Sequence, residues 1–177
     1  MKKIIFASLA LVAVVLAIAL IPGAKTNSDF LRIHIRADSN LDDDQNVKYI
    51  VKTAVVDYLT PYLTQATTKQ KAMDVVKQHK AQIKEVCDKT LAENGKNYTA
   101  TVKICAEQFP DRSYNGTTLP AGVYDALIIE LGSGSGNNWW CVVYPPLCFV
   151  GGEGSNSGNI TYKSKLWEII QSWQKNH

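Results

Sequence analysis

The stretch Leu31-Arg32-Ile33-His34-Ile35-Arg36-Ala37 alternates between apolar and polar side chains at every position. Successive side chains of a β-strand point to opposite faces, so the apolar set faces a core and the basic set faces the other way. The alternation therefore predicts a half-buried strand over residues 31–37. A turn rich in Asp and Asn follows over residues 38–45, and beyond it the period of the apolar residues becomes helical.

Two helices are predicted after this turn. In the first, the apolar residues that recur every three or four positions are Val47, Ile50, Val51, Ala54, Val55, Tyr58 and Leu59. Pro61 is expected to end or bend this helix, because its ring removes a backbone donor. The second helix is expected over residues 68–93, where His79 lies on the apolar stripe and is interpreted as a core histidine.

Three more strands are predicted, over residues 98–106, 122–131 and 139–144. The Gly-Ser-Gly-Ser-Gly run at 132–136 is interpreted as a flexible connection, and Pro145-Pro146 stops the last strand. The order strand-helix-helix-strand-strand-strand predicts an α+β fold, an antiparallel-rich sheet with helices packed on it. Parallel pairing of the first strand after its two-helix crossover is compatible with this order.

The first 24 residues predict a signal peptide or a membrane anchor. Lys2 and Lys3 precede an apolar run from Ile4 to Ile21 that only Ser8 interrupts. This run just reaches the length that can cross a bilayer, and the sequence leaves cleavage open. Lysines tend to stay on the cytoplasmic side, so the rest of the chain is expected outside the cytoplasmic membrane.

The remaining chain divides into a spacer, a domain, a linker and a tail. We expect the spacer at 25–29, the α+β domain at 30–150 and a Gly-rich linker at 151–160. Residues 161–177 predict an amphipathic helix whose apolar face holds Leu166, Ile169, Ile170 and Trp173. Docking of this helix on its own domain and a role at a partner or membrane both stay open.

Composition and charge argue against several classes of protein. The formal net charge is +3, and Lys2 and Lys3 supply two of these charges. A nucleic-acid partner is therefore not expected, because it requires a basic stripe that the chain lacks. The oxygen-bearing residues Asp38, Asn40, Asp42 and Asp44 have the every-other spacing of a calcium loop. However, Asp43 and Tyr49 stand where the loop needs Gly and Glu, so no metal site is predicted.

No catalytic residues and no cofactor are predicted. The run at 132–136 lacks the Lys-Ser/Thr of a phosphate loop, and no nucleophile motif surrounds any cysteine. Outside the cytoplasm the four cysteines, Cys87, Cys105, Cys141 and Cys148, allow three full disulfide pairings. Cys141 and Cys148 are the favoured pair, because the two prolines between them can turn the chain back. Two buried thiols are the alternative.

The segment Asn138-Trp139-Trp140-Cys141-Val142-Val143-Tyr144-Pro145-Pro146-Leu147-Cys148-Phe149 is unusual, because adjacent tryptophans in a strand point to opposite faces. It resembles the N-W-W-C-V-x-x-P-P-L-C-F signature of the stage II sporulation protein R family. Residues 31–39 resemble that family's R-x-H-x-x-A-N-S stretch, with Asp38 where Asn is usual, and residues 119–127 resemble its P-A-G-x-Y-x-A block. The resemblance covers about residues 31–149.

The resemblance implies an exported signalling protein. Members of this family are made in the forespore and exported into the space between its two membranes. There they trigger a membrane-embedded aspartic protease of the mother cell, which removes the pro-segment of the sigma-E precursor. The family supplies no agreed catalytic residues to transfer.

We therefore expect a protein ligand without enzymatic activity, which contacts its receptor through Trp139, Trp140, Tyr144 and Phe149. Cys141 and Cys148 would brace this region. One alternative is an exported cell-envelope hydrolase, which needs a cleft with a thiol or carboxylate close to His34 or His79. Another is a membrane-anchored envelope structural protein.

Overall fold

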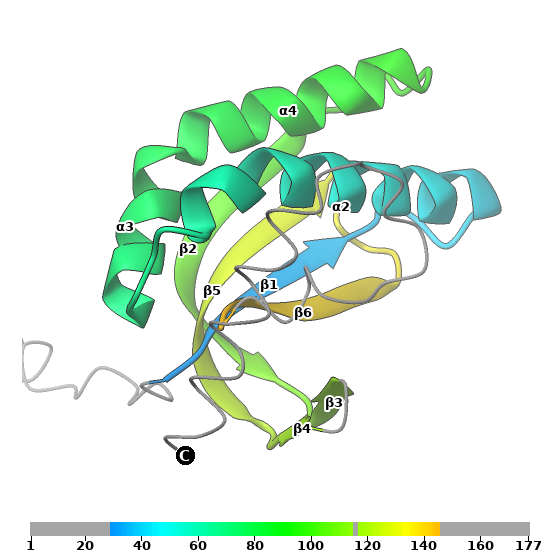
Figure 1. The fold of residues 1–177 in the computed structure, drawn as a ribbon. Helices are drawn as coiled ribbons and strands as arrows, with labels where there is room; N and C mark the ends of the chain where they lie inside the picture. Colours follow the sequence, from blue (N-terminus) through cyan, green and yellow to red (C-terminus); the bar gives the residue numbers. More distant parts are fainter. Residues whose placement is uncertain (1–28, 115–116, 146–177) are drawn as a thin grey trace, which may run out of the picture.

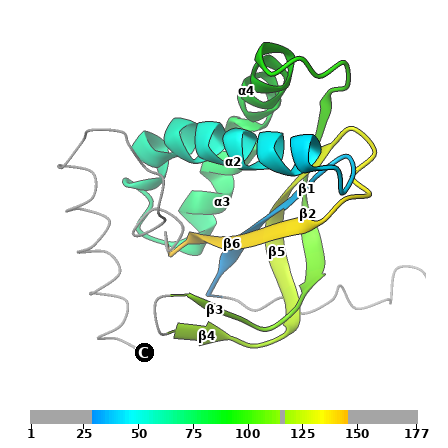
Figure 2. The same ribbon diagram turned by 90° about the vertical axis from the view of Figure 1, so that its right-hand side faces the viewer.

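The computed structural model describes residues 29–114 and 117–145. Three helices cover one face of a four-stranded mixed sheet, and a small hairpin lies below the other face (Figures 1 and 2). The elements in chain order are β1 (Leu31–Arg36), α2 (Asp42–Leu63), α3 (Lys69–Gln78), α4 (Lys80–Glu93), β2 (Ala100–Phe109), β3 (Arg112–Tyr114), β4 (Thr117–Leu119), β5 (Gly122–Leu131) and β6 (Asn138–Tyr144).

The sheet has the order β2-β5-β1-β6. β1 pairs in parallel with β5, whereas the β1–β6 and β2–β5 pairs are antiparallel. The α+β class and the mostly antiparallel sheet are confirmed, and the parallel pair falls on the first strand. In the β1–β6 ladder Leu31 lies opposite Tyr144, so the first strand begins beside the point where the last one ends.

The apolar faces of β1 and α2 meet in the main core. Leu31, Ile33 and Ile35 on β1 are at most 1% exposed and pack with a stripe from α2 that contains Val47, Val51, Val55, Leu59 and Leu63. Burying each such side chain contributes roughly 1.5–3 kcal/mol to folding. Ile50, which the sequence placed on this stripe, is 45% exposed, because the buried stripe continues from Val47 through Val51.

The predicted second helix is divided into α3 and α4, which is a correction. His79 separates them with backbone angles of −93° and 8°, outside the helical region. The His79 ring contacts two residues of α2. Its Nδ1 lies 2.6 Å from the hydroxyl oxygen of Tyr58, and its centroid lies 4.0 Å from the ring centroid of Tyr62. The aromatic contacts with α2 accompany the change of helix direction. His79 is thus half-buried and hydrogen-bonded.

Other boundaries also differ from those expected. α2 begins at Asp42, and three acidic residues occupy its first turn. Their negative charges interact favourably with the positive end of the helix dipole. Pro61 lies inside the last turn of α2 without ending it. The strand expected over 98–106 is Ala100–Phe109, and the β3–β4 hairpin was not predicted. Its strands are three residues each, too short for a period of two to stand out.

The connection between β5 and β6 is pinned to the turn before α2. The Asp38 carboxylate accepts a hydrogen bond of 2.6 Å from the backbone N–H of Ser133, and the Asn40 side-chain oxygen accepts one of 2.7 Å from that of Asn137. Gly136 donates its N–H to the carbonyl of Ala37 at 2.8 Å. A run that the sequence interpreted as a flexible connection is therefore tied down by several hydrogen bonds.

Asp44 connects the start of α2 to the segment before β2. Its carboxylate accepts hydrogen bonds from Ser39 Oγ at 2.5 Å, Lys96 Nζ at 2.8 Å and Tyr98 Oη at 2.7 Å. The bond from Lys96, followed by those from Ser39 and Tyr98, lowers the pKa of Asp44 from 3.8 to about 2. The carboxylate is 6% exposed, so these partners replace most of its water.

Several sequence predictions lie outside the described residues. These are the segment 1–24, the spacer as far as residue 28, the linker at 151–160 and the amphipathic helix at 161–177. Within the described ranges no helix is both long enough and apolar enough to cross a membrane.

Replacing Gly136 with Ala is expected to destabilise the fold by more than about 2 kcal/mol. A Cβ atom at this position would lie 2.2 Å from the backbone oxygen of Ser39, so the pinned turn must move apart. Gly95→Ala is the control, because its Cβ would meet nothing within 4 Å and only its positive φ is strained. Urea unfolding should show a loss of about 1 kcal/mol for the control. Equal losses for both would contradict the packing argument.

Replacing Asp44 with Asn is expected to lower the free energy of unfolding at pH 7 by about 2 kcal/mol. The folded-state pKa is lowered, so this stabilisation is complete above pH 3.8 and is lost as the pH falls toward 2. Wild type and variant should therefore converge in urea unfolding near pH 2. Asp42→Asn, at an exposed position of the same turn, serves as the control. A difference that persists unchanged at pH 2 would contradict the assignment.

Candidate functional site

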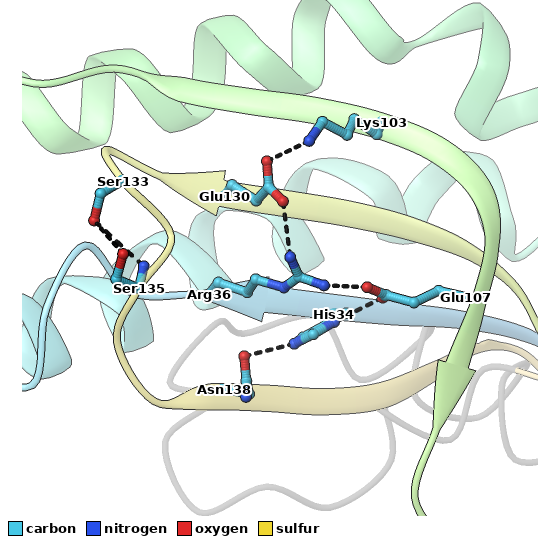
Figure 3. A network of polar contacts seen from close by, with 8 residues as sticks. All are labelled: His34, Arg36, Lys103, Glu107, Glu130, Ser133, Ser135 and Asn138. Carbon is cyan, nitrogen blue, oxygen red and sulfur yellow. Dashed lines mark hydrogen bonds and ion pairs between the residues drawn. The ribbon is translucent and has the colours of Figure 1, made fainter. Parts of the chain in front are cut away.

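One face of the sheet is covered by none of the described helices. We call it the helix-free face and define it by the side chains that point away from α2, α3 and α4: Arg32, His34, Arg36, Lys103, Glu107, Ile128, Glu130, Asn138 and Trp140. It contains a network of polar contacts that crosses all four strands (Figure 3). The alternation of β1 supplies Arg32, His34 and Arg36 to this face.

His34 lies at the centre of this network and is 5% exposed. Its Nδ1 lies 2.8 Å from Glu107 Oε2 on β2, and its Nε2 lies 2.8 Å from Asn138 Oδ1 on β6. Both partners are acceptors as placed, which a doubly protonated ring satisfies; a neutral ring requires the Asn138 amide to turn and donate. Either way, one ring links the sheet's two edge strands through β1.

Arg36 extends the network toward β5. Its guanidinium pairs with both Glu107 and Glu130, at 2.9 Å from Glu130 Oε1. Lys103 Nζ lies 2.6 Å from the other oxygen of Glu130. The charges thus alternate in sign across the sheet, and each carboxylate receives two donors. A network of this kind stabilises more than isolated surface ion pairs do.

Aromatic rings border the network at its other end. Arg32 is fully buried, with its guanidinium carbon 4.2 Å from the ring centroid of Phe109 and 5.0 Å from that of Tyr124. Trp140 stacks on His34 at a centroid distance of 5.3 Å. The guanidinium of Arg112, from the hairpin, lies 4.6 Å from the Trp140 ring. Such cation–aromatic contacts are worth about 0.5–2 kcal/mol each.

The predicted contact residues do not lie together. Trp140 belongs to the helix-free face, whereas Trp139 packs against the main core on the helical side, with Lys52 Nζ 5.9 Å from its ring. Tyr144 also packs against the main core, and its burial raises the pKa of its hydroxyl. Phe149 lies outside the described residues. The opposite orientation of the two tryptophans is the geometry that a strand requires.

The cysteines of the described residues differ in environment. Cys87 and Cys105 carry free thiols. Cys87 is fully buried, and this burial raises the pKa of its thiol to about 12, so it is not a thiolate nucleophile at neutral pH. Cys105 is exposed on β2. Cys141 is buried on β6, and Cys148 lies outside the described residues, so their pairing stays a prediction.

For the hydrolase alternative, the structure places a carboxylate beside His34 but no open cleft there. Glu107 is within hydrogen-bond reach of His34, yet both ring nitrogens of His34 are engaged and the ring is almost fully buried. At His79, the other histidine of this alternative, an open pocket of about 320 Å³ lies at the corner of α2 and α3, and Tyr62, Lys71 and Asp74 also help to line it. The hydrogen bond of the His79 ring is to the Tyr58 hydroxyl and not to a carboxylate. In the part of the chain that the structure describes, no three His, Cys, Asp or Glu side chains are placed to hold a metal ion.

The sequence missed the partners of the basic residues on β1. The partners of His34 and Arg36 are Glu107 and Glu130, which lie 71 to 94 positions away in the sequence. Lys103 joins the network through Glu130, which lies on a different strand. The one available signal was the regular alternation of Arg and His in a strand that was predicted to belong to a sheet. Such residues require acidic partners once the strand is central in a sheet.

Comparison with known proteins adds a family match. A family model described as "Stage II sporulation protein R (spore_II_R)" matches residues 27–153. A Bacillus subtilis (strain 168) protein named "Stage II sporulation protein R" is 36% identical over 120 residues, which is 68% of this chain and 54% of the relative. The chain therefore spans about half the length of this curated relative. No solved structure matches.

Replacing Glu107 with Gln is expected to lower the free energy of unfolding by about 1–3 kcal/mol, because Arg36 and His34 lose a charged acceptor at a site where the carboxylate side chain is 18% exposed. Lys103→Gln is the matched control. Its side chain is 51% exposed, so its loss should cost less than about 1 kcal/mol. Urea unfolding at pH 7 measures both. A larger effect for Lys103 would contradict the central role of Glu107.

Proposed function

Because the chain belongs to the stage II sporulation protein R family, we propose that it is an exported sporulation signalling protein that acts by contact with a protein partner. The family match over residues 27–153 is the observation that carries this proposal, since it spans the whole described domain. The partner that the proposal names is a membrane-embedded aspartic protease of the mother cell. Its activation leads to processing of the sigma-E precursor.

The proposal places the domain outside the cytoplasmic membrane, in the space between forespore and mother cell. The apolar run from Ile4 to Ile21 behind Lys2 and Lys3 supports export. The run either leaves with a cleaved signal peptide or stays as an anchor. In both cases the domain reaches its partner from the side of the membrane opposite to where it is made.

Activation by contact is a population shift in the protease. The signalling protein must bind the active arrangement of its receptor more tightly than the inactive one. A swing from nearly all inactive to nearly all active requires a difference of about 5.5 kcal/mol in binding free energy. No chemical step on the signalling protein is required. The engagement of His34 and Glu107 with each other agrees with this, because a general base needs a free nitrogen near its substrate.

A disulfide between Cys141 and Cys148 is part of the proposal. Two observations support it: Cys87 and Cys105 are free thiols, and Cys141 lies in the middle of β6, on the strand that leads to the two prolines. In an oxidising space such a bond would hold the residues that follow β6 close to the sheet.

Reconstitution tests the proposed function. The exported chain would be added outside cells that carry only the protease and the sigma-E precursor, and cleavage of the precursor would be followed. We expect cleavage that depends on the added protein. Absence of cleavage by a folded protein, with protease and precursor both present, would contradict the proposal.

Trp139→Ala and Trp140→Ala are each expected to reduce precursor processing in a sporulating strain, because large aromatic side chains dominate binding energy at protein interfaces. Glu85→Ala, at an exposed position of α4, is the control. Protein level and circular dichroism separate loss of folding from loss of contact. If both tryptophan variants fold and process the precursor normally, the contact assignment is wrong.

A further inference from the structure

We propose that the helix-free face, together with Arg112, is a docking surface for an acidic segment of the protein partner. The identity of that partner rests on the proposed function above, whereas the surface and its chemistry follow from the described residues. The occupant is an extended stretch rich in Asp and Glu. Two features of the face select it: cations that are more exposed than the carboxylates beside them, and hydrogen-bond donors that these cations leave unused.

The charges of the domain are distributed unevenly. Residues 29–145 contain 13 Lys and Arg against 14 Asp and Glu, so the described domain as a whole is slightly acidic. The helix-free face with Arg112 carries three cations that solvent reaches, Arg36, Lys103 and Arg112, beside the carboxylates Glu107 and Glu130, whereas its fourth cation, Arg32, is fully buried. With Asp111, the exposed neighbour of Arg112 in the chain, these reachable charges balance, so the exposure of the charges and not their number favours an acidic partner. The acids Asp38, Asp42, Asp43 and Asp44 cluster instead around the start of α2.

The cations of the face keep unused hydrogen-bond donors, whereas every carboxylate oxygen of the network already accepts one bond. Both oxygens of Glu107 and both oxygens of Glu130 already accept bonds from His34, Arg36 or Lys103. By contrast, Lys103 has three N–H donors and uses one of them, and the guanidinium of Arg36 has five and uses two. The guanidinium of Arg112 lies over the Trp140 ring and is exposed. An incoming group that fits these donors is an acceptor such as a carboxylate.

Arg36, Lys103 and Arg112 are the cations of the face that solvent reaches, whereas Arg32 is buried. The side chain of Lys103 is 51% exposed and that of Arg36 is 29% exposed, whereas those of Glu107 and Glu130 are each 18% exposed. A partner that approaches the face therefore meets positive charge first. Trp140, between His34 and Arg112, adds an aromatic surface, and Trp and Arg are the residue types enriched at the centres of protein interfaces.

A protein segment fits this face better than a lipid surface does. The two carboxylates are fixed among the cations by their ion pairs, and a continuous layer of phosphate groups would meet them as well as the cations. A peptide can place its acidic side chains beside Lys103 and Arg112 and leave the carboxylates uncontacted. β2 and β5 bend toward the β3–β4 hairpin, which lies below the same face (Figures 1 and 2). Arg112 is the first residue of β3, and its guanidinium lies over the Trp140 ring.

The double variant Lys103→Glu/Arg112→Glu tests the inference in the full chain. We expect at least a tenfold loss of precursor processing, and of binding to the external part of the protease, with binding by the wild type weakening as salt is raised. Lys77→Glu/Lys80→Glu is the matched control, because it makes the same change of charge at two exposed positions of the helical layer. Lys103→Gln/Arg112→Gln should show a smaller loss in the same direction.

Circular dichroism and thermal unfolding establish that each variant is folded. Wild-type-like processing and binding by a folded Lys103→Glu/Arg112→Glu protein would overturn the inference, and so would an equal loss in the matched control. A second arm uses vesicles of phosphatidylglycerol and phosphatidylethanolamine. Loss of vesicle binding with unchanged protease binding would show that the face contacts lipid, which also overturns the inference. Failure of the wild type to trigger cleavage would instead contradict the proposed function.

Discussion

The structure depends on the neutralisation of basic side chains on a strand that is buried on both faces. β1 lies between β5 and β6 in the sheet. The side chains on one side of β1 pack on the helices, and those on the other side belong to the helix-free face. Unpaired, Arg36 and His34 would make this central position costly, because buried charges need partners. Glu107 and Glu130 from β2 and β5 supply these partners, and Asn138 from β6 completes the set. The register of the four strands and the polar network therefore require each other.

Local patterns predicted most of the elements. The strand at 122–131 agrees with β5 at both ends, because apolar residues occupy both of its faces and Gly stands at either end. The alternation over 31–37 predicted β1 but described it as half-buried, whereas Arg32 and His34 are buried as well. Alternation reports the two faces of a strand and says nothing of what covers the second face. That information depends on β2, more than 60 residues away.

The candidate site was predictable only in part for the same reason. Trp139 and Trp140 stood out in the sequence, and strand geometry implied that they face opposite sides. The acids that complete the network are single residues in ordinary strands, and only the sheet order brings them beside β1. The division of the second helix at His79 likewise depends on Tyr58 and Tyr62 of another helix. The spacing of residues within one element does not show contacts between elements that are distant in the sequence.

The pairing of Leu31 with Tyr144 has a mechanical consequence. Because the two strands are antiparallel neighbours, tension applied to the flanks of the domain would pull their adjoining ends directly apart. The β1–β6 ladder would then open like a zipper, one pair after another, instead of resisting as a whole in shear. β6 is an edge strand and β1 keeps its ladder with β5, so β6 would detach first while the helical core stays closed. The domain is thus built to yield at the strand that carries its two adjacent tryptophans.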